Sequence, residues 1–182
     1  MSDQPSPTRR GFTLMEMLLV VVVAMIASAL VMPMFQQTDA TRLSGAAKLL
    51  AADLAYAQVE SIAHGDDPRV VVFDTASATY RIAPSSTPTT PITGDAGMPY
   101  PVTFGVGRAA SLGGVTIQSV SVGGDDTLGF LIYGQLDQTT DATITLASGP
   151  RTLTLTVDAV SGEVSVGLTN GGSDAEAWWG TV

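Results

Sequence analysis

Residues 9–35 read RRGFTLMEMLLVVVVAMIASALVMPMF, and this stretch decides the architecture of the chain. From Met17 onward its only strictly polar side chain is Ser28. A helix over residues 12–35 would be roughly 36 Å long at about 1.5 Å per residue, which is about the length needed to cross a bilayer core. The sequence therefore predicts a membrane-spanning helix at the N-terminus.

Two ordinary explanations of this run fall short. A secretory signal would have a shorter apolar region with small residues before its cut, whereas residues 33–35 are Pro-Met-Phe. A plain signal anchor accounts for the apolar run and for Arg9 and Arg10, which hold the N-terminus in the cytoplasm. It does not account for Glu16, because a carboxylate in an apolar helix costs a few kcal/mol in hydrocarbon and usually has a partner and a role.

The string R-R-G-F-T-L-M-E, followed at once by the apolar run, resembles the class III leader of type IV prepilins and type II secretion pseudopilins. The resemblance implies that residues 1–11 are a leader, which a prepilin peptidase removes between Gly11 and Phe12. The same enzyme would then methylate the new amino group of Phe12. Glu16 would become the fifth residue of the mature chain, where the family carries a glutamate, and Pro33 would take the place of a helix-kinking proline.

Two residues of this helix keep alternative interpretations. Glu16 of one subunit could pair with the Phe12 amine of a neighbour in the low-dielectric core of a filament, where the benefit would be axial register more than stability. The less favoured alternative is a solvated glutamate at the level of the lipid headgroups, without a partner. Pro33 lacks an N–H and clashes with the carbonyl of residue 29, so it would bend the helix or mark its end.

A second, amphipathic helical segment is predicted over residues 36–65. Its apolar side chains recur at spacings of three and four and form one stripe, which consists of Leu43, Ala47, Leu50, Leu54 and Ala57. The charged residues are expected mostly off that stripe: Asp39, Arg42, Lys48, Asp53 and Glu60. Gly65 and Pro68 predict where the helix ends. One continuous helix is thus expected from about residue 12 to 64, and its second half needs a sheet to cover the stripe.

Residues 66–168 read as a β-rich globular domain. Strands are predicted at residues 69–73, 79–82, 102–104, 115–122, 128–133, 142–147, 152–157 and 163–166. Residues 84–101 contain five prolines and read as an irregular loop. The order of one long helix followed by antiparallel strands predicts an α+β fold, which the resemblance to prepilins implies is pilin-like. Residues 169–182 are expected to form a flexible acidic tail.

This part also resembles a narrower family, the GspH/FimT group of minor pilins and pseudopilins, over about residues 8–167. The similarity lies in LLAADLAYAQVESI at 49–62, LGFLIYG at 128–134, the strand around Ile144, and VDAVSGEVSV at 157–166. It implies a minor subunit that helps start or cap a type IV pilus or a type II secretion pseudopilus. The implied partners are the prepilin peptidase, other pilins or pseudopilins, and the inner membrane.

The resemblance also implies a location. The chain would be a single-pass protein of a bacterial inner membrane, with its N-terminus cytoplasmic and its C-terminal domain periplasmic, before it enters the filament. The function expected is structural, and the chain is a substrate of the peptidase and not itself an enzyme. The alternatives are a binding module displayed at a pilus tip, for adhesion or DNA uptake, and an anchored enzyme.

Composition disfavours some of these classes. The formal net charge is −9, so phosphate backbones are repelled and nucleic-acid binding is disfavoured. The chain has no cysteine and one histidine, His64, which excludes disulfides, thiolate catalysis and a multi-histidine metal site.

No catalytic residue, metal site or cofactor is predicted. Gly105-Val106-Gly107 with Arg108 lacks the strand–loop–helix context of a phosphate loop and predicts a turn. The pairs Asp125-Asp126 and Asp137 with Asp141 lack the ligand spacing of a calcium loop and predict solvated turns. His64 fits a helix C-terminus, where the helix dipole favours a cation.

The tail ends in a pair of aromatic residues, Trp178 and Trp179. Exposed tryptophans can anchor a partner. The alternative is that they fold back over the domain, and the sequence favours neither.

Overall fold

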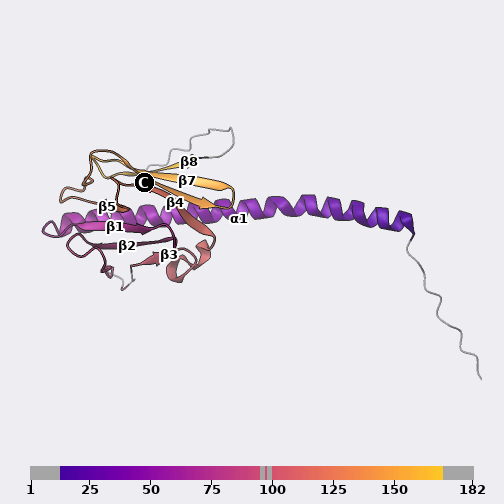
Figure 1. Ribbon diagram of the computed structural model, residues 1–182, viewed down its shortest axis with the longest axis horizontal. Helices are drawn as coiled ribbons and strands as arrows, with labels where there is room; N and C mark the ends of the chain where they lie inside the picture. The colour runs from indigo at the N-terminus through magenta and orange to yellow at the C-terminus, as the bar shows by residue number, and fades with distance from the viewer. Residues whose placement is uncertain (1–12, 95–96, 98–99, 170–182) are drawn as a thin grey trace, which may run out of the picture. The chain divides into compact units, whose positions relative to one another are not determined.

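The computed structural model describes residues 13–94, 97 and 100–169, and the side chains of residues 29–38, 168 and 169 lie outside that description. Helix α1, Leu14–Ala63, is 50 residues long and opens the described chain (Figure 1). The prediction of one long N-terminal helix is confirmed. By its internal contacts the chain divides into two units, Met1–Gln37 and Thr38–Val182, which we describe separately.

In the first unit, α1 presents apolar side chains to its surroundings. Every side chain from Thr13 to Ser28 is exposed, and the large apolar ones range from 44% exposed at Val22 to 86% at Leu14. The Ser28 hydroxyl donates a hydrogen bond to the Ala24 carbonyl at 2.8 Å, so its polar atom is satisfied within the helix. The described part of the chain contains no helix with the length and apolar character of a membrane span.

In the second unit, the strands form two antiparallel sheets of four strands each. The first has the order β3-β2-β1-β5, built from β1 (Arg69–Asp74), β2 (Thr79–Pro84), β3 (Val102–Thr103) and β5 (Thr127–Gly129). The second has the order β4-β6-β7-β8, built from β4 (Val115–Ser121), β6 (Ala142–Ser148), β7 (Arg151–Val157) and β8 (Val164–Thr169). The α+β fold class is therefore confirmed.

Alternation of side chains fixes the register of the second sheet. In β6 the residues Ala142, Ile144 and Leu146 are buried and the threonines between them are partly exposed, as expected for a sheet with one dry face. β7 runs antiparallel to β6 with Ile144 opposite Leu155. A bulge between Ile117 and Ser119 interrupts the pairing of β4 with β6.

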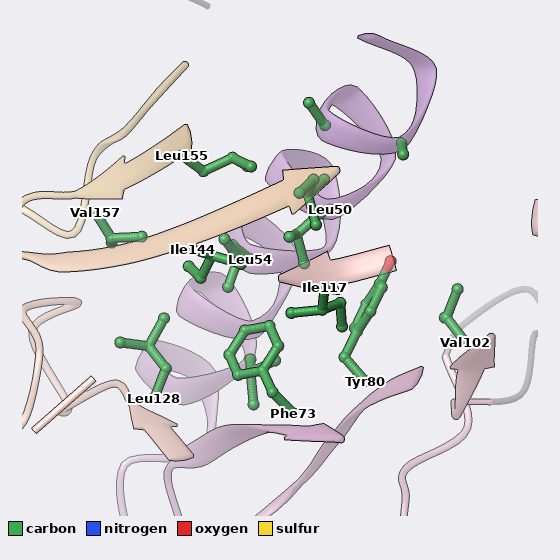
Figure 2. Packing of buried hydrophobic residues seen from close by; sticks show 14 of the residues in the cluster. Leu50, Leu54, Phe73, Tyr80, Val102, Ile117, Leu128, Ile144, Leu155 and Val157 are labelled. Atoms are coloured by element: carbon green, nitrogen blue, oxygen red, sulfur yellow. The ribbon is translucent and has the colours of Figure 1, made fainter. Parts of the chain in front are cut away.

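The second half of α1 packs against both sheets. Its predicted stripe is fully buried, from Leu43 at 2% exposed to Leu50 and Leu54 at 0%. The stripe belongs to one apolar cluster with buried residues from β1 to β7, and the partly buried Val164 of β8 packs against it. Figure 2 shows Leu50 and Leu54 near Ile144 of β6 and above Phe73 of β1. The amphipathic helix thus finds the sheet cover that its sequence requires.

Two local features differ from the sequence expectation. The strand predicted at residues 128–133 ends at Gly129, because Leu131 to Gly134 form a turn in which the Gly134 N–H donates to the Leu131 carbonyl at 2.9 Å. A short 3₁₀ helix, η1 (Gly107–Leu112), occupies the position where only a turn was expected.

The end of α1 is tied directly to the first strand. Ser61 is fully buried, and its hydroxyl accepts a hydrogen bond from the Arg69 N–H at 2.8 Å while donating to the Ala57 carbonyl at 2.9 Å. One side chain thereby satisfies backbone groups of both elements, which fixes the turn between the helix and β1.

Candidate functional site

The described chain begins with a well-formed helix cap. The Glu16 N–H donates to the Thr13 hydroxyl at 3.2 Å and to the Thr13 carbonyl at 3.1 Å. A threonine at the N-cap with a glutamate three residues later is the sequence pattern of a capping box. The helix therefore starts beside the junction that the sequence predicts for cleavage, and Thr13 is a structural residue that the sequence analysis did not single out.

Glu16 sits on a fully exposed apolar surface. It is the only charged residue in the sequence from Thr13 to Thr38. It makes no ion pair within the described part of the chain. A carboxylate in the first turn is favoured by the helix dipole, so Glu16 can be accommodated in the isolated subunit without a cationic partner.

Several predicted site residues lie outside the described residues. These are Arg9 and Arg10, the cleavage pair Gly11 and Phe12, and the aromatic pair Trp178 and Trp179. α1 continues through the position of Pro33, but its side chain is among those not described. The roles predicted for these residues stay predictions.

The second unit contains a buried cluster of polar side chains that the sequence analysis missed. Asp53 was expected off the apolar stripe of α1, and this expectation is wrong: its side chain is buried, with the residue 4% exposed. Its carboxylate accepts hydrogen bonds from the Tyr80 hydroxyl at 2.5 Å and the Tyr100 hydroxyl at 3.0 Å. It also accepts a hydrogen bond from the Arg108 guanidinium and forms an ion pair with it.

The aromatic rings pack around the same pair. The Tyr56 ring of α1 stacks on the Tyr100 ring, with centroids 5.9 Å apart and planes 9° from parallel. The Arg108 guanidinium carbon lies 4.7 Å from the Tyr100 ring centroid, as in a cation–π contact. Tyr100, in the loop after β2, and Arg108 of η1 thus hold their segments to the helix.

The electrostatics follow from this packing. Burial raises the pKa of the Tyr100 hydroxyl to about 12, and the negative charge of Asp53 acts in the same direction. Burial and Asp53 likewise raise the pKa of Tyr80. The bond to Asp53 raises the pKa of Arg108 against the opposing effect of desolvation. The two tyrosines and Arg108 therefore stay protonated at neutral pH and donate hydrogen bonds to the Asp53 carboxylate. Such mutual satisfaction of buried polar groups is what a structural network requires.

A signal for Asp53 does exist in the sequence. Asp53 comes three residues after Leu50 and seven after Ala46, and both of these residues are completely buried. Those spacings place it on the buried side of the helix. The identity of its cationic partner could not be found in this way, because Arg108 lies 55 residues later.

The other candidates of the sequence analysis have local partners. Arg108, considered for a phosphate loop, is bound to Asp53. His64 directly follows α1, and its Nδ1 lies 3.0 Å from the Glu60 carbonyl and 3.3 Å from the Glu60 carboxylate. Both interactions are within hydrogen-bonding or ion-pairing range, as expected for a side chain at a helix C-terminus.

Two of the acidic residues considered for calcium, Asp125 and Asp141, accept hydrogen bonds from backbone N–H groups. An Asp125 carboxylate oxygen accepts from the Thr127 N–H at 3.3 Å, and one of Asp141 accepts from the Ala159 N–H at 2.9 Å. Burial, with the nearby charge of Asp125, raises the pKa of Asp137. Within the described ranges, no three acidic, histidine or cysteine side chains gather as metal ligands would.

Known proteins show two similarities. The family profile described as the prokaryotic N-terminal methylation motif matches residues 7–32. Among solved structures, the type IV minor pilin FimU of Pseudomonas aeruginosa, strain PAO1, is similar with a TM-score of 0.50. The similarity covers 72% of this chain and 90% of FimU at 16% sequence identity, which establishes the shared pilin-type fold. No curated protein matches the chain by sequence.

Proposed function

We propose that this type IV pilin-like chain is a minor structural subunit of a type IV pilus or a type II secretion pseudopilus. Its precursor is cut by a prepilin peptidase between Gly11 and Phe12, and the new Phe12 amine is methylated. The observation that carries this proposal is the methylation motif at residues 7–32, which spans the expected junction and leads into an exposed apolar helix. No enzymatic activity is proposed for the chain itself.

The exposed surface of α1 supports an assembly role. Sixteen consecutive side chains, Thr13 to Ser28, are exposed, and most are large and apolar. Such a surface is unstable in water and needs lipid or other helices as its surroundings. We infer a precursor held in the inner membrane with Arg9 and Arg10 in the cytoplasm, followed by transfer of the helix into a bundle of like subunits.

Glu16 is the polar group that this bundle must accommodate. In a helical core an isolated carboxylate is strongly disfavoured, whereas an ion pair with hydrogen bonds is tolerated. The Phe12 amine created by cleavage is the cation that the mature chain itself supplies, four positions earlier. Pairing between the Glu16 of one subunit and the Phe12 amine of the next would fix how far the subunits are displaced along the filament axis.

The narrower resemblance to GspH and FimT supports a place at the start or the tip of the filament. The strongly acidic composition, with a net charge of −9, supports a protein-binding role over a nucleic-acid-binding one at that position.

The test replaces Glu16 and follows incorporation into filaments in the native cell. Glu16→Ala should leave leader removal intact and reduce incorporation at least tenfold, because the Phe12 amine loses its partner. Glu16→Asp is the matched control, since it keeps the charge, and it should recover a large part of the wild-type level. Equal incorporation of all three proteins would contradict the proposal.

A further inference from the structure

Three segments that are distant in sequence converge at the end of α1. The Gln58 side-chain amide donates to the Gly134 carbonyl and to the Ser161 carbonyl, both at 2.8 Å. The turns after β5 and β7 therefore lie against the same part of the helix, as Figure 1 also shows. At Gly162, where φ is +69°, a Cβ would lie 2.2 Å from the Gly134 carbonyl oxygen, so only glycine permits this close approach.

The helix end and these two turns display a group of exposed apolar side chains. Tyr133 is 80% exposed and Val160 is 84% exposed, whereas Phe130 and Leu136 on either side of the first turn are buried. A Cβ added at Gly65 would lie 3.2 Å from the Ile132 side chain, and one added at Gly134 would lie 3.2 Å from the Ile62 side chain. The turn and the helix end are therefore in close contact. We call this group the helix-end surface; it consists of Val59, Ile62, Leu131, Ile132, Tyr133 and Val160.

Acidic residues are frequent in the three segments that carry the helix-end surface. The three segments, residues 58–67, 131–134 and 158–163, contain five acidic residues and no lysine or arginine: Glu60, Asp66, Asp67, Asp158 and Glu163. The Asp158 carboxylate accepts from the Val160 N–H at 3.0 Å and the Ser161 N–H at 2.7 Å, so its charge is fixed beside Val160. Glu60 is paired with Arg69 at 3.5 Å, and the four other carboxylates leave an excess of negative charge in these segments.

We propose that the helix-end surface docks a separate polypeptide that presents apolar side chains ringed by lysine or arginine. An apolar centre with a polar rim is the usual anatomy of a protein interface. A second copy of this chain, meeting at the same surface, would bring two acidic rims together, and an anionic bilayer would also be repelled. A partner with apolar side chains ringed by basic ones would bury the apolar centre and would also be attracted by the acidic residues. The proposal does not depend on cleavage at Gly11.

The test places a photoreactive benzophenone side chain at position 133 of the full-length protein in its native cell. Because Tyr133 is exposed, the substitution leaves the core untouched. The expected result is a cross-link to one other polypeptide, mapped by mass spectrometry to an apolar segment flanked by basic residues. The matched control carries the same group at Val106, which is 63% exposed and lies outside the helix-end surface, and it should not give that cross-link.

Charge variants complete the test. Asp66→Lys with Glu163→Lys should reduce the cross-link at least tenfold, and Asp66→Asn with Glu163→Gln should give an intermediate loss. Asp158 is left unchanged because it holds its turn. A cross-link to a second copy, to lipid or to residues 170–182 of the same chain would overturn the proposal. The absence of any cross-link would overturn it too, and so would a cross-link whose yield is unchanged in the charge variants.

Discussion

The Asp53 carboxylate on α1 forms an ion pair with the Arg108 guanidinium on η1, 55 residues further along the chain. Two tyrosine hydroxyls complete the coordination of Asp53, from Tyr80 and Tyr100. This network joins the helix, β2 and the proline-rich loop, so it keeps the loop packed on the domain. The energetic consequence is an asymmetry: losing one partner is costly, whereas replacing the whole pair is not.

Arg108→Ala should therefore destabilise the domain by about 3 kcal/mol, because the buried Asp53 carboxylate loses its counter-charge. The measurement is urea unfolding of the full-length protein in detergent, followed by tyrosine near-ultraviolet circular dichroism. The double variant Asp53→Leu with Arg108→Met is the control, since it removes both charges and should be more stable than Arg108→Ala. A single variant as stable as the wild type would contradict the role of the ion pair.

The buried tyrosines predict a loss of stability at high pH. Unfolded tyrosine has a pKa of about 10, while that of Tyr100 is raised to about 12 in the folded protein. The folded state thus retains a proton that the unfolded state releases, so stability is complete below pH about 10 and falls as the pH rises toward 12. In a pH titration, the ultraviolet absorbance of tyrosinate should appear at higher pH in the folded protein than in the protein unfolded in urea. Identical titration curves in both would contradict the burial of these hydroxyls.

Asp67 predicts a second dependence, at low pH. Its carboxylate accepts hydrogen bonds from the Ser86 N–H at 3.0 Å and the Ser86 hydroxyl at 2.8 Å, and these bonds hold its pKa below the usual 3.8. A lowered pKa stabilises the folded state above pH about 4, and the contribution disappears as the pH falls through the folded pKa. Asp67→Asn should flatten the acid side of the stability profile. An unchanged acid profile in that variant would show that other carboxylates dominate it.

Thr13 should control the order of the first helical turn. Thr13→Ala removes the bond to the Glu16 N–H and should cost the helix start about 1 kcal/mol. Hydrogen exchange at the Glu16 amide of the full-length protein in detergent should then be about fivefold faster. Thr13→Ser is the matched control because serine keeps the hydroxyl, and it should exchange like the wild type. The same acceleration in both variants would argue against a capping role.

The parts of the fold with strong periodicity could be predicted from sequence. The stripe from Leu43 to Ala57 placed the buried face of α1, and the alternation of Thr152 to Val157 placed β7, because both patterns reflect burial on one side. The region of residues 128–134 was predicted wrongly past Gly129. Its apolar residues resemble a strand, but the chain turns at Leu131 to Gly134, and the Gly134 carbonyl accepts a hydrogen bond from the Gln58 side chain of the distant helix.

The buried polar cluster shows a different limit. Asp53 was expected off the apolar stripe, although its spacing from the buried Leu50 places it on the buried side of the helix. Whether a charged residue on a stripe is buried depends on a partner, and Arg108 and Tyr100 reach Asp53 only through the path of the loop. Local sequence carries no information on that path. The N-terminal methylation motif is the opposite case, because it is a continuous string, and the family profile matches it at residues 7–32. The cleavage junction between Gly11 and Phe12 stays a prediction.

Mass spectrometry of the mature N-terminus tests the central claim most directly. The protein is isolated from the membrane and filament fractions of its native cell, and its N-terminal peptide is sequenced. The account predicts a chain that begins at Phe12 and carries a methyl group on its amine. A protein that still carries Met1 to Gly11 in the filament fraction would contradict it, because Glu16 would then have no new amine to meet.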